Sequence, residues 1–343
     1  MKAVFSILIL CLFLAQHMAA QVGGERVYSF LNIPTSATQA ALGGEALTVK
    51  DNVNKPLWNP ATISRFMDNQ AAVNYVNYLA GINVGSATFA HLVNRRFGTL
   101  HGGIQYIDYG EFIAADEEGV ETGDFGARDL AVSVGYAYNI PWSDFYVGAN
   151  VKFLSSKIEN FTSQGLATDI GVYYFSDYRP YSFTAVIRNL GYQITPYEEV
   201  REEIAYDIAI GASFLMSDVP IKWHLTMNSL QQWNLAVPNP SNSNTDLDGN
   251  TEEESISFLD NMMRHFVIGV ELFPESKFNL RFGYNFRRAA ELKLAEARTF
   301  AGLSAGFGLK MGRFKFDYAF TKYHPVDNSS TFTLYIDLTR KGF

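Results

Sequence analysis

The sequence predicts an all-β protein: a transmembrane antiparallel β-barrel of about 14 strands, with an N-terminal segment that plugs the lumen. Three observations predict this fold. An export signal precedes a chain in which 15% of the residues are aromatic. Most later segments alternate between apolar and polar residues with a period of two, as membrane-spanning strands do. The connections between these segments are alternately short and mostly long.

The first element is a signal peptide over residues 1–20. Lys2 precedes an apolar run from Ala3 to Leu14, and small residues follow, so we place the cleavage site after Ala20. This run is too short for a membrane-spanning helix. The only cysteine, Cys11, lies within it, and Leu10 is too large for a typical lipoprotein processing site. The exported chain is therefore expected to have neither a disulfide nor a lipid anchor.

Charge and hydropathy narrow the class further. The net charge is −8, and without Lys2 it is about −9, which argues against nucleic acid as a partner. After the signal peptide, no stretch approaches the roughly 20 apolar residues of a transmembrane helix. In lipid every backbone polar group must be bonded within the protein, so a non-helical spanning structure must be a closed barrel. An exported, aromatic-rich chain of this kind is typical of the bacterial outer membrane.

The second element, residues 21–69, does not alternate and is predicted to plug the barrel. A barrel of about 14 strands encloses a space that must either conduct or be blocked. Within this segment, residues 35–42 are expected to form a short helix, with Pro34 near its start and Gly43 and Gly44 at its end. An extended periplasmic tail is the alternative. Apolar Leu31 and Ile33 argue against it, because a solvated tail would be more polar.

The third element, residues 70–343, is predicted to be the barrel. In the segment "RFKFDYAFTK", Phe316 and Tyr318 alternate with Lys315 and Asp317. A charge on the lipid face of such a barrel costs about 2–4 kcal/mol at the bilayer midplane, so the charged face must point inwards. The last strand, in "STFTLYIDLTRKGF", is expected to close the barrel against the first. The predicted strands are 70–79, 81–93, 97–114, 127–139, 144–156, 164–176, 181–193, 203–216, 220–233, 263–274, 278–290, 298–311, 313–324 and 330–340.

The connections predict the orientation. Those after even-numbered strands are short, whereas most of those after odd-numbered strands are long and polar, such as "ADEEGVETGDFGA". Outer-membrane barrels have short periplasmic turns and long external loops. We therefore expect an integral outer-membrane protein with extracellular long loops and both termini in the periplasm. A soluble two-sheet sandwich also accommodates alternating strands, but it gives no reason for loops to segregate by length.

The longest connection, residues 234–262, is the candidate contact site for a partner. It is polar but carries apolar residues near both ends, and apolar anchors within a polar rim are typical of protein contacts. The candidate contact residues are Trp233, Leu235, Val237, Phe258 and Leu259.

Other motifs give no catalytic, cofactor or metal site. "NTDLDGNTEEES" resembles the start of a calcium loop, but its twelfth position is Ser255 instead of the bidentate Glu, so a solvated acidic loop is favoured over calcium binding. The glycines of "GLSAGFGLKMG" lie within a strand, where they favour close approach of the plug over phosphate binding. The five histidines after the signal peptide show no ligand spacing, and no "GxSxG" element is present. We therefore predict no enzyme activity.

The N-terminal block resembles a known family. "YSFLNIPTSATQAALGG", with "NPA" at 59–61 and "NLG" at 189–191, resembles the PorV/PorQ family of type IX secretion system outer-membrane proteins in Bacteroidota, closest to the PorQ members. The resemblance implies a non-catalytic component of the attachment complex that anchors a PorZ-like surface protein beside PorU and PorV, near lipopolysaccharide. It assigns no binding residues.

A second function is kept open. "NPA" also resembles FadL-type transporters, which are 14-stranded barrels with an N-terminal hatch that carry hydrophobic small molecules across the outer membrane. Such a role needs an apolar pocket through the plug and an opening in the wall, visible as a bulge that interrupts strand pairing. The charged inward faces favour a blocked polar lumen.

Overall fold

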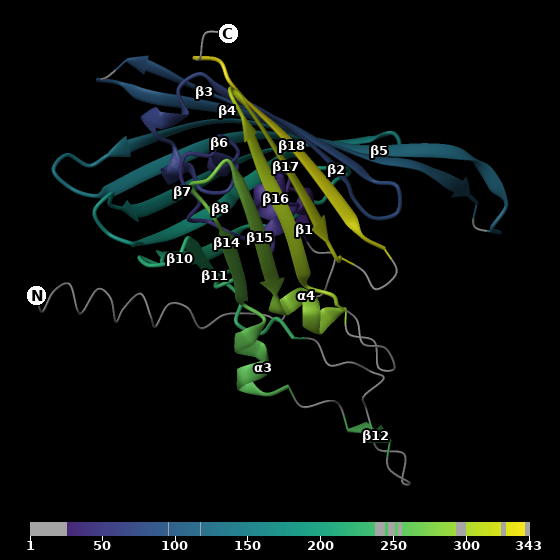
Figure 1. Cartoon of the computed structure of the whole chain (residues 1–343). Coiled ribbons are helices and arrows are strands. Elements are labelled where there is room, and N and C mark those ends of the chain that lie inside the picture. Colours follow the sequence, from purple (N-terminus) through teal and green to yellow (C-terminus); the bar gives the residue numbers. More distant parts are fainter. Residues whose placement is uncertain are drawn as a thin grey trace, which may run out of the picture.

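Fourteen strands form a closed antiparallel barrel in the computed structural model, which confirms the predicted fold (Figure 1). The structure describes residues 26–94, 96–116, 118–236, 244–245, 251–252, 256–292, 300–323 and 327–339. The predicted signal peptide lies outside them. In chain order the barrel strands are β2 (Gln70–Asn77), β3 (Asn83–Asn94), β4 (Gly98–Ala115), β5 (Glu121–Asn139), β6 (Phe145–Ile158), β7 (Phe161–Phe175), β8 (Tyr181–Thr195), β10 (Asp207–Leu215), β11 (Ile221–Met227), β14 (Phe266–Leu272), β15 (Phe278–Asn285), β16 (Leu303–Met311), β17 (Phe314–Thr321) and β18 (Ser329–Asp337).

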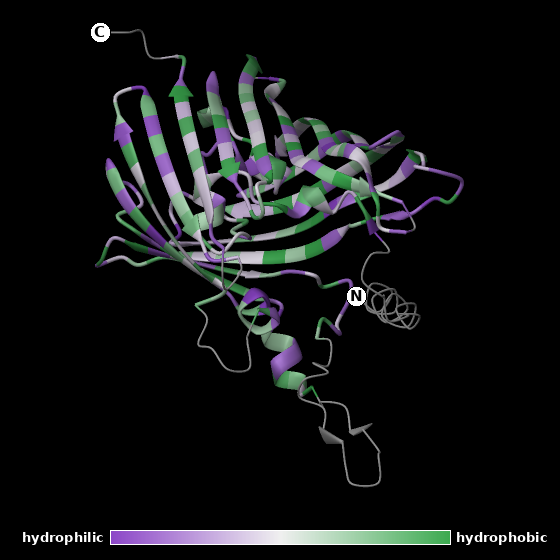
Figure 2. Ribbon diagram, turned by 90° about the vertical axis from the view of Figure 1, so that its right-hand side faces the viewer, coloured by the Kyte–Doolittle hydropathy of each residue, from purple (hydrophilic) through white to green (hydrophobic). Residues whose placement is uncertain are grey.

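The alternation in the sequence separates the two faces of the wall. On β17 and β18, Phe320 is 39% and Leu334 41% exposed, whereas Asp317 and Thr333 are at most 1% exposed. Green and purple bands accordingly alternate along the strands in Figure 2. β18 pairs with β2 from Ser330↔Asn77 to Asp337↔Gln70 and closes the barrel. The last strand is thus needed to satisfy the backbone of the first.

Residues 26–69 fill the lumen. They form the short helices η1 (Ser29–Asn32), α2 (Ala37–Ala41), η2 (Lys55–Leu57), η3 (Pro60–Thr62) and η4 (Arg65–Met67). Ser36 caps α2 by accepting a hydrogen bond from the Gln39 amide, and Gly43 and Gly44 follow the helix with φ of 89° and 96°. A short helix therefore lies within the predicted range 35–42. None of the helices in the described part of the chain is both long and apolar enough to cross a membrane.

The plug enters the barrel from the end that carries the longer connections, here called the long-loop end. β1 (Arg26–Val27) pairs in parallel with β9 (Glu203–Ile204), which lies in the connection between β8 and β10 at that end. Asp337, at the end of β18, lies at the opposite, short-turn end beside Arg313. The expectation that both termini share one end is therefore wrong for the first described residues. Pairing with β9, which sequence alternation does not reveal, is the reason.

Two predicted boundaries also differ. The predicted loop over 115–126 is shorter in the structure, because β5 begins at Glu121 and extends the pairing with β4. The two strands form a hairpin arm, here defined as residues 109–126, and pair with each other up to Ala115↔Glu121. β3 pairs with β4 only as far as Asp108, and β6 pairs with β5 only as far as Ala127. The described edges of the arm therefore lie outside the barrel ladder, apart from a hydrogen bond from the Glu159 amide to the Gly126 carbonyl. Residues after Asn285, predicted as strand, form α4 (Phe286–Glu291), because the Asn285 side chain caps a helix there.

Candidate functional site: an aromatic platform at the long-loop end

The connection between β11 and β14 carries an exposed apolar cluster, here called the platform and defined as Trp233, Phe258 and Leu259. The Trp233 and Phe258 rings stack with centroids 5.4 Å apart. Phe258 is 69%, Leu259 61% and Trp233 38% exposed. Phe258 and Leu259 begin α3 (Phe258–Met263), which projects away from the barrel at the end opposite the C-terminus (Figure 1). Large apolar side chains gathered on a projecting element are typical of a contact surface.

Two buried polar residues hold the platform in place. The Asn261 side chain donates a hydrogen bond to the Trp233 carbonyl at 2.6 Å, and its oxygen accepts one from the Leu235 amide at 2.9 Å. His265, which is fully buried, stacks under Trp233 with centroids 5.1 Å apart, and its Nδ1 lies 2.7 Å from the Asn228 carbonyl. The Ser257 hydroxyl caps α3 by accepting from the Asp260 amide at 3.1 Å. The exposed rings are therefore fixed by hydrogen bonds from both sides of the connection.

The structure sorts the five residues singled out from the sequence. Trp233, Phe258 and Leu259 lie together at the surface, although 24 intervening positions separate Trp233 from Phe258 in the sequence. Leu235 is only 7% exposed, so it supports the connection from within. Val237 lies outside the described residues. Sequence reasoning missed Asn261 and His265, because a buried amide or imidazole has no signature in a single sequence.

Near the long-loop end, packed side chains fill the lumen where a transporter would have an open apolar path. Phe30 and Leu31 of the plug pack with Ile107 and Leu154 of the wall, and all four are at most 6% exposed. Deeper in the barrel, Arg188 forms ion pairs with Glu45 of the plug at 3.3 Å and with Asp207, and lies 4.1 Å from the centre of the Trp58 ring. Burial raises the pKa of Glu45 to about 7, although Arg188 beside it acts in the opposite direction.

A bulge interrupts the pairing of β7 and β8, as an opening in the wall would require, but polar contacts fill it. Arg188 and Asn189 of β8 stand opposite Asp169 of β7, and Asn189 has a φ of 58°. The Asp169 side chain is fully buried, forms an ion pair with Lys152 at 2.8 Å and accepts from the Asn189 amide at 2.8 Å. Because these groups satisfy one another, the bulge re-aims side chains and leaves the wall closed.

The remaining motifs from the sequence are the calcium-like string and the glycine-rich segment. Among the described residues no group of three or more His, Cys, Asp and Glu side chains is placed to hold a metal ion. Most of the calcium-like string lies outside those residues. Gly306 does lie against the plug, since a Cβ there would be 2.7 Å from that of Ala41.

Comparisons with known proteins support the fold. No family model matches the chain, and no curated protein matches its sequence. Among solved structures, the toluene transporter TbuX of Ralstonia pickettii is similar with a TM-score of 0.52 and 12% identity, over 90% of this chain and 98% of that one. The monoaromatic hydrocarbon channel TodX, as a deletion mutant, gives 0.53 and 13%, over 89% and 97%. The chain thus has the barrel fold of these outer-membrane transporters.

Proposed function

We propose that this chain is a non-catalytic, integral component of the outer membrane in which the plugged barrel anchors a surface partner through the platform. The exposed and braced stack of Trp233 on Phe258 carries the proposal. In this role the long-loop end faces the cell exterior and the short-turn end faces the periplasm, as in other outer-membrane barrels.

We further propose that the partner belongs to the type IX secretion system. The resemblance of residues 28–44 to the PorV/PorQ family supports this, and it points to a PorZ-like surface protein beside PorU and PorV. An aromatic anchor pair within a polar connection suits a protein partner better than lipopolysaccharide, whose phosphates would be repelled by an acidic connection. The attachment of secreted cargo would then depend on this protein without any chemistry of its own.

Transport of hydrophobic molecules is the second candidate, favoured by the fold shared with TbuX and TodX. Two features argue against transport. Side chains fill the lumen near the long-loop end, and polar groups around Asp169 fill the bulge between β7 and β8. A transporter with this plug would need to displace Phe30 and Leu31 together with the Glu45–Arg188 ion pair, all of which are buried or nearly so.

A double substitution tests the proposal. Phe258→Ser with Leu259→Ser should abolish co-purification of the secretion-system partner from detergent-solubilised membranes and release cargo that is normally attached to the surface. The matched control is Trp142→Ser, which removes an exposed aromatic (104% exposed) from the turn between β5 and β6 at the short-turn end. Normal cargo attachment in a gene-deletion strain, combined with failed uptake of a hydrophobic substrate, would favour transport and contradict anchoring.

A further inference from the structure

The short-turn end contains a cavity of about 570 Å³, here called the vestibule, which the platform does not involve. Its rim comes from three turns, at Arg179, Glu275 and Arg313, and its floor includes Asn52 of the plug. It lies inside the barrel mouth and opens towards the side that we assign to the periplasm. A solute from that side can therefore reach it without displacing the plug.

The vestibule is cationic although the protein as a whole is acidic. Seven of its lining residues are Lys or Arg and five are Asp or Glu, whereas the whole chain has a net charge of −8. Ion pairs absorb part of this charge: Arg281 contacts Glu271 at 2.8 Å and Asp317 at 3.1 Å, and Lys315 contacts Asp317 at 3.2 Å. These ion pairs offset the charges of Arg281 and Lys315.

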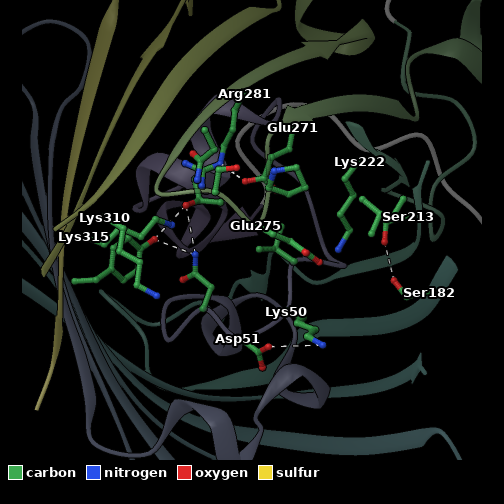
Figure 3. A pocket seen from close by; sticks show the side chains of 18 of the residues that line it. Lys50, Asp51, Ser182, Ser213, Lys222, Glu271, Glu275, Arg281, Lys310 and Lys315 are labelled. Atoms are coloured by element: carbon green, nitrogen blue, oxygen red, sulfur yellow. Dashed lines mark hydrogen bonds and ion pairs between the residues drawn. The ribbon is translucent and has the colours of Figure 1, made fainter. Parts of the chain in front are cut away.

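Other cations remain available at the walls. Among the described residues, Lys222, Lys310 and Arg179 form no ion pair, and Glu275 is a carboxylate of the lining that likewise forms none. Figure 3 shows Lys222 on one side of the cavity and Lys310 with Lys315 on the other, with Glu275 between them. An anion placed in a cavity that several such cations line is attracted by all of them at once.

The wall of the vestibule offers hydrogen bonds besides charge. Asn279 is 3% exposed and lines the vestibule, yet its side-chain oxygen has no hydrogen-bond partner. Ser182 and Ser213, whose hydroxyls lie 2.7 Å apart, contribute further donors and acceptors to the same cavity. A buried polar atom without a partner costs free energy unless a ligand or water meets it. The lining therefore suits a molecule that carries both an anionic group and hydroxyl or amine donors.

We propose that the vestibule binds a small, water-soluble phosphate ester or pyrophosphate from the short-turn side, held between Lys222 and Lys310. Oxyanions of this type accept several charge-assisted hydrogen bonds at once, which a single carboxylate does less well. The cavity has room for a group larger than inorganic phosphate. This site is independent of the proposed secretion partner, because it lies at the opposite end of the barrel from the platform.

Calorimetric titration of the purified full chain in detergent tests the proposal, with inorganic pyrophosphate and glucose 1-phosphate as probes. We expect saturable binding that weakens with added salt, and Lys222→Gln with Lys310→Gln should weaken it by at least about tenfold, the minimum for losing charged hydrogen bonds. The matched control is Lys157→Gln with Lys322→Gln, which removes two positive charges at the long-loop end and should leave the affinity unchanged.

Three outcomes would overturn the proposal: no binding of either probe to the wild-type chain, equal binding by the vestibule variant and the wild type, or tighter binding of dihexanoyl phosphatidic acid than of both probes. The last result would assign the site to a lipid headgroup. Far-UV circular dichroism of both double variants verifies that the barrel is intact. Normal cargo attachment in the gene-deletion strain, with pyrophosphate binding by the purified chain preserved, would contradict the proposed function alone, so the two proposals fail separately.

Discussion

Asn261 is the residue on which the geometry of the platform depends most. Asn261 lies on α3, and its side chain bonds to Trp233 and Leu235 at the start of the connection, so it ties the two ends of the connection together. Asn261→Ala removes these hydrogen bonds and leaves the buried Leu235 amide without its partner, which costs about 1–3 kcal/mol. We expect faster hydrogen exchange over residues 228–236 and 256–265, measured by mass spectrometry. Gln232→Ala, which removes only an exposed contact with the Asn234 carbonyl, is the control; equal exchange in the two variants would contradict the assigned role.

Glu45 and Lys55 give the plug opposite responses to pH. Burial raises the pKa of Glu45 from 4.5 to about 7, so its contribution to stability is present at low pH and is lost as the pH rises through 7. Burial lowers the pKa of Lys55 from 10.5 to about 7, so its contribution is present at high pH and is lost as the pH falls through 7. Near neutrality the two trends oppose each other.

Substitution should separate these two trends. Between pH 6 and 8, the slope of plug stability against pH should be more positive in Glu45→Gln than in the wild type, and more negative in Lys55→Met. Each substitution should change the slope by up to about 1.4 kcal/mol per pH unit. Hydrogen exchange of residues 36–63, corrected for intrinsic exchange rates, measures this. Parallel pH profiles in all three proteins would show that neither group titrates in this range.

At the scale of elements, close packing fixes the plug against the wall. Gly148 of β6 faces η3 so tightly that a Cβ would lie 2.4 Å from the Pro60 carbonyl carbon. Gly148→Val must therefore displace η3, and we expect a lower midpoint of thermal unfolding, since overpacking typically costs about 1–3 kcal/mol. Gly102→Val on β4, where nothing lies within 4 Å, is the control. A midpoint equal to that of the control would show that the plug is not held at this position.

The hairpin arm should be separable from the barrel. Its described strands pair with each other beyond Asp108 and Ala127, apart from the hydrogen bond that the Gly126 carbonyl accepts from the Glu159 amide. Replacing residues 111–125 with a short turn removes no hydrogen bond of the closed barrel, so we expect unchanged heat-modifiable migration on electrophoresis and an unchanged unfolding midpoint. A barrel that fails to assemble after this replacement would mean that the arm guides closure.

Sequence alternation predicted the barrel strands because lipid and lumen impose opposite chemistries on the two faces of each strand. β17, where Phe320 faces outward and Asp317 inward, shows this directly. Beyond the membrane this contrast is lost. The alternation therefore predicts a loop over 115–126, although β5 already begins at Glu121. At β15 the helical cap from Asn285 overrides the apparent continuation of the alternation.

The candidate site was predicted only in outline. The apolar residues of the connection stand out in a polar sequence, which is why Trp233, Phe258 and Leu259 could be named. Their convergence depends on hydrogen bonds from Asn261 and on the ring of His265, which are tertiary contacts without a local pattern. The vestibule escaped prediction for the same reason, because Lys222 and Lys310 come from strands far apart in the sequence.

As a whole, the molecule is a closed, plugged barrel whose two ends differ in chemistry. The long-loop end presents exposed Trp233 beside Phe258 and Leu259 of α3. The short-turn end presents cations around a cavity, and Lys222, Lys310 and Arg179 form no ion pair with the described residues. The wall is closed by β18 on β2, and the lumen is closed by residues 26–69. The proposed anchoring role needs no open path through such a molecule, whereas the alternative of transport does.

Photo-crosslinking in living cells tests the anchoring role most directly. A benzoylphenylalanine at position 259, next to the stacked Trp233 and Phe258, should crosslink to a surface protein of the secretion system, whereas the same group at position 142 should not. Crosslinks from position 259 only to lipopolysaccharide, or none at all in cells that attach cargo normally, would contradict the account.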